Sequence, residues 1–137
     1  MSFDLFIQCF GETELSGLSR DAVRALFPID ESSSQKDYWK VKYDDRNQAD
    51  IDVTPLQADD RRLLHLCVNR PCAEQKLWDA LFSILTMGEV VVFFPGGPLI
   101  VSSEKTAATL PPEMTEGFGP PICVDSGGSI LKIIQES

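Results

Sequence analysis

An amphipathic segment at residues 73–87, set between two short apolar runs, constrains the fold more than any other feature of the chain. Its apolar residues recur at helical spacing and form one wide stripe: Leu77, Trp78, Leu81, Phe82, Ile84 and Leu85. The flanking runs LLHLCV (63–68) and EVVVFF (89–94) are apolar at successive positions, which is typical of strands covered on both faces. The sequence therefore predicts a long helix packed against a sheet.

Residues 38–68 predict a β-meander that ends in the first of these runs. Trp39 and Val41 alternate with lysines, and Ile51 and Val53 alternate with aspartates, so two strands with one apolar face each are expected. If both apolar sets face one core, the favoured register places Lys40 opposite Asp52 and leaves a loop at residues 45–47. Residues 63–68 then supply the third strand.

The remaining segments predict shorter elements around this meander. Residues 3–9 alternate as a strand, and Ser19 is suited to cap a short helix that ends before Pro28. Residues 30–37 are polar and predict an exposed loop, and residues 122–126 predict a last strand. Ser103 can cap a turn of helix through Ala108, and PPEMTEGFG (111–119) predicts a short helix with a prolyl start and a glycyl stop. Residues 129–137 suit a helix by spacing and a strand by their β-branched content, and the helix is favoured. The expected fold is α+β, a mixed and mainly antiparallel sheet in a single domain spanning residues 1–137.

Size and charge exclude several classes of function. The chain has 137 residues, 43% of them hydrophobic, which suits one globular domain, and its apolar runs are too short to span a bilayer. A net charge of −9 argues against nucleic-acid and anionic-membrane partners because both would repel the protein. The N-terminus lacks the basic region of a signal peptide, so we expect an unprocessed cytoplasmic protein.

The cysteine and histidine content predicts neither disulfides nor a metal centre. Four dispersed cysteines suggest reduced thiols, and one histidine leaves the usual zinc patterns incomplete. The FFPGGP segment has no following lysine and serine or threonine, so it predicts a tight turn instead of a phosphate-binding loop. No cofactor and no metal ion are expected.

Residues 30–60 hold nine acidic residues against four basic ones, and this surplus is the strongest functional signal. Asp50 and Asp52 are expected to face lysines across the hairpin. Four other aspartates lie at strand ends and have no obvious local partners except nearby arginines. Together with Tyr38, which must face away from Trp39, they are the predicted partner-binding residues: Asp44, Asp45, Asp59 and Asp60.

A thiol-dependent enzyme is the main chemical alternative. His65 and Cys67 lie two residues apart on a predicted strand and therefore share a face, as a nucleophile and a base would require. Cys72 follows Arg70 and precedes the long helix, and both the cation and the helix dipole would lower its pKa. A homo-oligomeric scaffold is a third possibility. We predict no catalytic residue in the favoured interpretation.

Four segments carry a resemblance to known proteins: MSFDLFIQCF, YWKVKYDD, CVNRPCAEQKLWDALFSIL and VVVFFPGG. In these segments, and in size, acidity and α+β composition, the chain resembles small bacterial immunity proteins of polymorphic or contact-dependent toxin systems. Such proteins share no common binding signature, so the resemblance assigns no residue roles. It implies a cytoplasmic, non-enzymatic protein that binds and neutralises a cognate toxin, which the acidic composition suggests has a basic surface.

Overall fold

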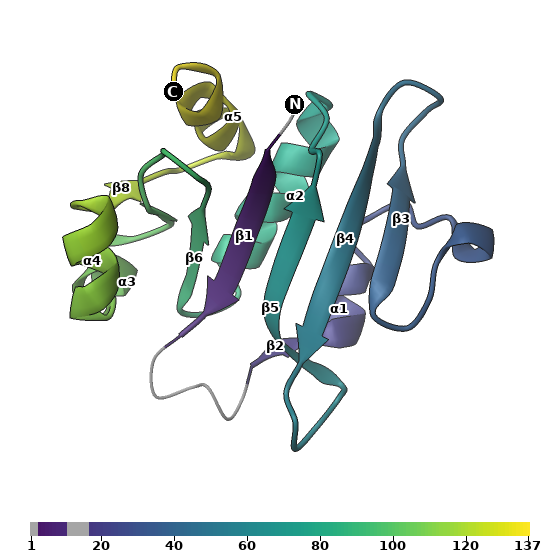
Figure 1. Cartoon of the computed structure of the whole chain (residues 1–137), viewed down its shortest axis with the longest axis horizontal. Helices are drawn as coiled ribbons and strands as arrows, with labels where there is room; N and C mark the ends of the chain where they lie inside the picture. Colours follow the sequence, from purple (N-terminus) through teal and green to yellow (C-terminus); the bar gives the residue numbers. More distant parts are fainter. Residues whose placement is uncertain (1–2, 11–16) are drawn as a thin grey trace.

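A single twisted sheet organises the chain in the computed structural model, which describes residues 3–10 and 17–137 (Figure 1). The order of the strands is β3-β4-β5-β1-β6-β7-β8, and β2 pairs with one end of β5. All pairs are antiparallel except β7 with β8. The strands are β1 Asp4–Cys9, β2 Leu18–Ser19, β3 Tyr38–Lys42, β4 Gln48–Pro55, β5 Arg62–Asn69, β6 Val90–Phe93, β7 Ile100–Val101 and β8 Ile122–Cys123. The predicted α+β class and mainly antiparallel sheet are confirmed.

The helices lie mostly on one side of this sheet. They are α1 Arg20–Arg24, α2 Gln75–Leu85, α3 Glu104–Ala108, α4 Pro112–Phe118 and α5 Gly127–Gln135, together with the short 3-10 helix η2 Glu31–Ser33. α2 lies behind the central strands and α5 packs against α2, whereas α3 and α4 lie beside β6 and β7 (Figure 1). The hydroxyls of Ser19, Ser103 and Ser126 accept hydrogen bonds from backbone N–H groups and so cap three of these helices.

The main core lies between the sheet and α1, α2 and α5. Alternate residues of each central strand point into it, among them Leu5 and Ile7 of β1, Ile51 of β4 and Val68 of β5, all completely buried. Trp78 of α2 is also completely buried, and its indole N–H donates to the carbonyl of Cys72. A second, smaller apolar cluster joins α3 and α4 to the other side of the sheet: Phe10, Val91, Leu99, Val101 and Leu110.

The predicted hairpin register is wrong by two residues. Tyr38 pairs with Asp52 and Lys40 with Asp50, because the loop spans residues 43–47 instead of 45–47. The carboxylate of Asp44 sets this longer loop by accepting hydrogen bonds from the N–H groups of Arg46 and Asn47, both at 2.8 Å. Since a shift of two preserves the alternation of a strand, Trp39 still faces the core and Tyr38 the other side.

Two further expectations need correction. Strict alternation along the predicted strand 63–68 would place Leu63 on the face of His65 and Cys67. Thr54 pairs with His65 but Pro55 with Leu63, so a bulge places Leu63 in the core instead. Pro55 has no N–H to donate to the ladder, which explains why the register changes there. The polar segment 30–37 is not a simple loop, since it contains η2, and bridges at Ile29 and Gln35 tie its ends to β3.

Within residues 3–10 and 17–137, every helix falls short of the length and apolar character that crossing a membrane requires.

Candidate functional site

The acid-rich stretch forms a network of contacts within the chain. All nine acidic side chains of residues 30–60 have a hydrogen-bond or ion-pair partner in the described structure. The pairs are Asp30 with Ser32, Glu31 with Arg24, Asp37 with Arg20, Asp44 with Asn47, Asp45 with Lys42, Asp50 with Lys40, Asp52 with Asn69, Asp59 with Arg61 and Asp60 with Lys36. The expectation that the loop aspartates mostly lack partners is therefore wrong.

The predicted partner-binding aspartates form two groups instead of one. Asp44 and Asp45 lie in the β3–β4 loop, and Asp59 and Asp60 lie in the β4–β5 turn. These loops are at opposite ends of β4, whose eight residues span about 25 Å at the usual rise of a strand. The structure does not bring the four carboxylates together as one cluster.

Within the β3–β4 loop the two aspartates have different roles. Hydrogen bonds from the side chain of Asn47 and from the backbone hold the pKa of Asp44 below its usual value, so this carboxylate stays ionised. Asp45 forms an exposed ion pair with Lys42 at 3.2 Å. Asp44 therefore stabilises the loop, whereas the carboxylate of Asp45 remains accessible to a partner.

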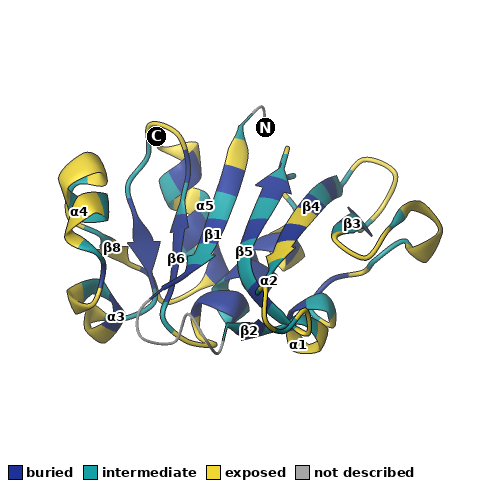
Figure 2. Cartoon of the chain, turned by 60° about the horizontal axis from the view of Figure 1, so that its bottom comes forward, coloured by how far each residue is buried: buried dark blue, intermediate teal, exposed yellow. Residues whose placement is uncertain are grey.

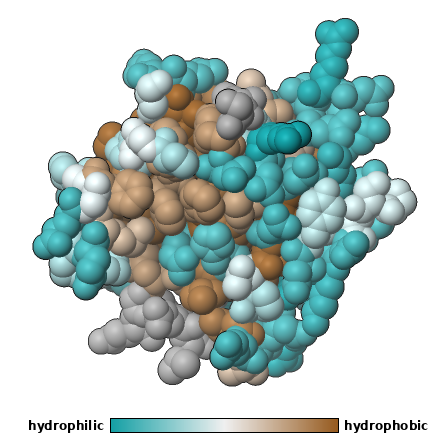
Figure 3. Space-filling model, viewed as in Figure 1, coloured by the Kyte–Doolittle hydropathy of each residue, from teal (hydrophilic) through white to brown (hydrophobic). Residues whose placement is uncertain are grey.

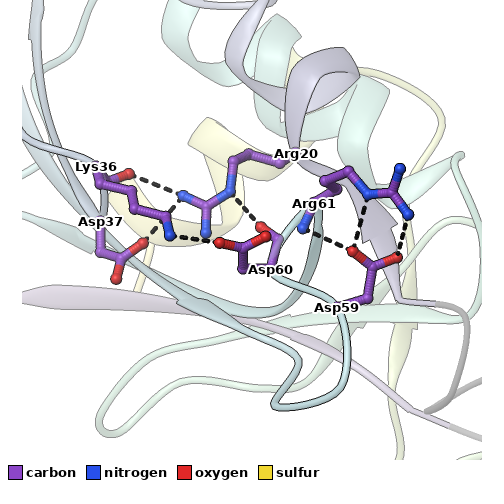
Figure 4. Close-up of polar contacts among 6 residues, drawn as sticks. All are labelled: Arg20, Lys36, Asp37, Asp59, Asp60 and Arg61. Carbon is purple, nitrogen blue, oxygen red and sulfur yellow. Dashed lines mark hydrogen bonds and ion pairs between the residues drawn. The ribbon is translucent and has the colours of Figure 1, made fainter.

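The β4–β5 turn is joined to the segment before β3 by a chain of polar contacts (Figure 4). Arg20 donates from Nε to the carbonyl of Asp60 at 2.7 Å and from Nη1 to the carbonyl of Lys36 at 2.8 Å. Lys36 and Asp60 form an ion pair, and Arg61 donates from Nε to Asp59 at 3.1 Å. The hydrogen bonds to Lys36 and Arg61 lower the pKa values of Asp60 and Asp59 respectively.

The hydroxyl of Tyr38 also has a hydrogen-bond partner within the sheet. Its hydroxyl donates to Oδ1 of Asp50 at 2.7 Å, and this bond raises the pKa of Tyr38 to about 12. Partial burial works to raise the pKa of Asp50, but hydrogen bonds from Tyr38 and Lys40 outweigh it and leave that pKa below its usual value. Tyr38 lies on the side of the sheet opposite Trp39, as predicted, but its polar end is already bonded.

That side of the sheet, opposite α1, α2 and α5, is here called the open face. Burial alternates along its strands, and the open-face residues are partly or fully exposed over β4, β5 and β1 (Figure 2). Hydrophobic side chains gather on it over β1 and β6, and hydrophilic ones over β3 and β4 (Figure 3). The open face thus combines an apolar half with a polar half.

Four rings form a continuous row across the apolar half of the open face. The ring of Phe6 lies 5.9 Å from that of His65 and 5.4 Å from that of Phe93, measured between centroids. Phe93 in turn lies 5.6 Å from Phe118, whose side chain is 39% exposed. We call these four residues the aromatic row. Sequence reasoning missed it, although Phe6 stands at a position where the strand alternation calls for a polar residue.

Carboxylates border the aromatic row. Asp4 precedes Phe6 by two residues, so both lie on the open face of β1, and the carboxylate of Asp4 is exposed. Asp52, also exposed, accepts a hydrogen bond from Asn69 Nδ2 at 2.7 Å. This combination of aromatic rings and a charged border is typical of the surfaces through which proteins bind one another.

The thiols do not show the features of an activated nucleophile. Cys67 and His65 share the open face, as predicted, but the Cys67 thiol donates to Oδ1 of Asn69 at 3.3 Å. Burial, and then the charges of Asp4 and Asp52, raises the pKa of Cys67, which is opposite to what nucleophilic attack requires. Cys72 precedes the start of α2 by three residues and packs against the core.

Metal binding finds no support in the part of the chain that the structure describes. Among residues 3–10 and 17–137, no three side chains of the histidine, cysteine, aspartate or glutamate type are arranged to hold an ion.

The single histidine predicts a specific pH dependence of stability. Burial disfavours the imidazolium and lowers the pKa of His65, so below about pH 6.5 the unfolded chain binds a proton more readily than the folded one. We expect the free energy of unfolding, measured by urea titration, to fall as the pH is lowered from 7 to 5. His65→Phe should remove most of this loss, because the carboxylates with lowered pKa values lose their contribution only below about pH 5. An equal loss in the variant would contradict the assignment.

Comparison with known proteins assigns neither a family nor a function to these residues. No protein-family model matches the chain, and neither a curated protein nor a solved structure matches it significantly.

Proposed function

We propose that the chain is a non-enzymatic inhibitor of the immunity type, which binds a basic toxin protein through the open face and neutralises it in the cytoplasm. The observation that carries the proposal is the aromatic row beside exposed carboxylates on the side of the sheet away from the main core. Aromatic residues dominate the binding energy of protein interfaces, and acidic groups select a basic partner. The immunity-type resemblance of the sequence supports the same partner class.

The loop aspartates have a second role in this proposal. Exposed ion pairs contribute little to stability, so a cation of the partner can replace Lys36 or Arg61 at low cost. The net charge of −9 attracts a basic protein from a distance and accelerates association. Asp45, Asp59 and Asp60 would thus act mainly on the rate of encounter, and the open face on the lifetime of the complex.

The test of the function is protection in living cells. The candidate toxin to test is the product of the gene directly upstream of the one encoding this chain, produced in a host cell with and without the chain. We expect the toxin alone to stop growth and co-production of the chain to restore it. A neighbouring product that is harmless alone, or toxicity that the chain does not relieve, would contradict the proposal.

Binding kinetics with that toxin separate the two surfaces. Changing Asp44, Asp45, Asp59 and Asp60 to asparagine should lower the association rate roughly tenfold at low ionic strength and weaken its salt dependence. Phe118→Ala should instead raise the dissociation rate about tenfold, since it removes an exposed ring of the aromatic row. Met87→Ala is the matched control, because Met87 is 40% exposed at the end of α2, away from the open face.

Each kinetic result can contradict its part of the proposal. Unchanged association rate and salt dependence in the fourfold variant would remove the loop aspartates from the encounter. Equal dissociation rates for Phe118→Ala and Met87→Ala would remove the aromatic row from the interface.

A further inference from the structure

The aromatic row and Asp4 form one small constellation within the open face. Asp4 and Phe6 lie on the same side of β1, about 7 Å apart along the strand. Phe6 stands at the middle of the row, between the rings of His65 and Phe93. An extended side chain that lies across Phe6 can therefore bring its end to the carboxylate of Asp4.

We propose that this constellation binds an arginine side chain of the partner, an inference that rests on the proposed function. The plane of the guanidinium would lie on the ring of Phe6, and its N–H groups would pair with the carboxylate of Asp4. Asp4 suits this role because its carboxylate is exposed and, within residues 3–10 and 17–137, makes no hydrogen bond or ion pair. The nine acidic side chains of residues 30–60, in contrast, each have a hydrogen-bond or ion-pair partner.

Arg70 follows Asn69, the strand partner of Asp4, and its charge acts on Asp50. Three other groups of the open face, Lys40, Asp52 and His65, neither occupy nor oppose this site. Lys40 is held by Asp50 at 3.1 Å, and the carboxylate of Asp52 by Asn69 at 2.7 Å. Burial lowers the pKa of His65, so its ring is neutral near pH 7 and does not repel a cation. The constellation therefore has one carboxylate without a hydrogen bond or ion pair, two residues along β1 from the central ring of the row.

Arginine fits this arrangement better than lysine. The guanidinium is planar and weakly hydrated, so it leaves water for an aromatic surface more readily than an ammonium group does. It can also donate two hydrogen bonds to one carboxylate while its plane remains against the rings. A lysine of equal charge would keep the attraction to Asp4 but lose most of the contact with the rings.

The test uses two blocked peptides of equal charge, tetra-arginine and tetra-lysine, with the full chain at pH 7. Binding is followed by NMR of the phenylalanine rings and backbone amides. We expect tetra-arginine to bind about three- to tenfold more tightly and to shift the signals of Phe6, Phe93 and Phe118. Equal affinities, or shifts confined to the loops of Asp44 and Asp59, would overturn the proposal.

Variants then separate the contribution of the Asp4 carboxylate from that of the Phe6 ring. Asp4→Asn should weaken both peptides, whereas Glu136→Gln, an equal change of charge at the C-cap of α5, should not. Phe6→Leu keeps an apolar side chain in place and should abolish the preference for arginine; a preference that persists would contradict the role of the ring. Because no toxin is present, failure of this test leaves cell protection standing, and failure of cell protection leaves the arginine preference standing.

Discussion

Replacing Gly127 by alanine should destabilise the protein by about 2–3 kcal/mol, the upper part of the range of about 1–3 kcal/mol expected for overpacking. Gly127 is buried at the start of α5, where this helix meets α2. A Cβ atom there would lie 2.5 Å from the backbone nitrogen of Asp79 and 2.5 Å from the carbonyl carbon of Trp78. Both atoms belong to the backbone of α2, so relief requires the two helices to move apart and to open the core around Trp78.

Gly128 offers a matched control one residue further along α5. A Cβ atom at Gly128 would have only side-chain atoms nearby, the closest being Ser126 Oγ at 3.7 Å. Gly128→Ala should therefore stabilise the protein by about 0.5–1 kcal/mol, because alanine loses less entropy than glycine on forming a helix. Urea titration of both variants measures the difference, and equal effects would show that close helix packing is not the cause.

The sequence was sufficient to predict the main elements of the fold, though not the short strand β2 or the helix η2, because alternation and helical spacing are local signals. The strand at β1, the meander and helix α2 all occur where the pattern placed them. Even the register error left each residue on its correct face, since the slip was two residues. Predictions of which side chains are buried were therefore more robust than predictions of which side chains touch.

Contacts that depend on the loops and on the order of the strands could not be predicted from the sequence. The register depends on a five-residue loop held by Asp44, a side-chain-to-backbone contact that alternation does not encode. β1 lies between β5 and β6, although both strands are distant from it in the sequence. This order brings Phe6, His65, Phe93 and Phe118 together from four separate elements, so the aromatic row could not be predicted from any one segment.

The candidate site lies elsewhere than predicted, again because contacts between distant segments are not visible in the sequence. Counting charges placed the functional surface at the acidic loops, but a count does not show which cations lie next to which carboxylates. Once folded, the acid-rich stretch is connected to basic groups before it, within it and after it, including Arg20, Lys40 and Arg61. Several of these aspartates thus hold the loops in place. Part of the acidic surplus therefore stabilises the fold instead of marking a binding surface.

Arg20 is the residue on which this network most depends, and Arg20→Met should cost about 2–3 kcal/mol of stability. Its side chain is only 12% exposed and donates to two backbone carbonyls, those of Lys36 and Asp60, as well as to Asp37 at 3.0 Å. Methionine preserves the apolar stem but removes the hydrogen bonds to both carbonyls, and losing hydrogen bonds from a charged group costs about this much. Urea titration measures the loss.

Two further variants identify which contacts of Arg20 matter. Arg20→Lys keeps the charge, but one ammonium group cannot reproduce the planar guanidinium that reaches both carbonyls, so its loss should approach that of Arg20→Met. Asp37→Asn removes only the ion pair, whose carboxylate is 50% exposed, and should cost less than about 1 kcal/mol. If Asp37→Asn were as damaging as Arg20→Met, the ion pair and not the backbone clamp would hold these two loops together.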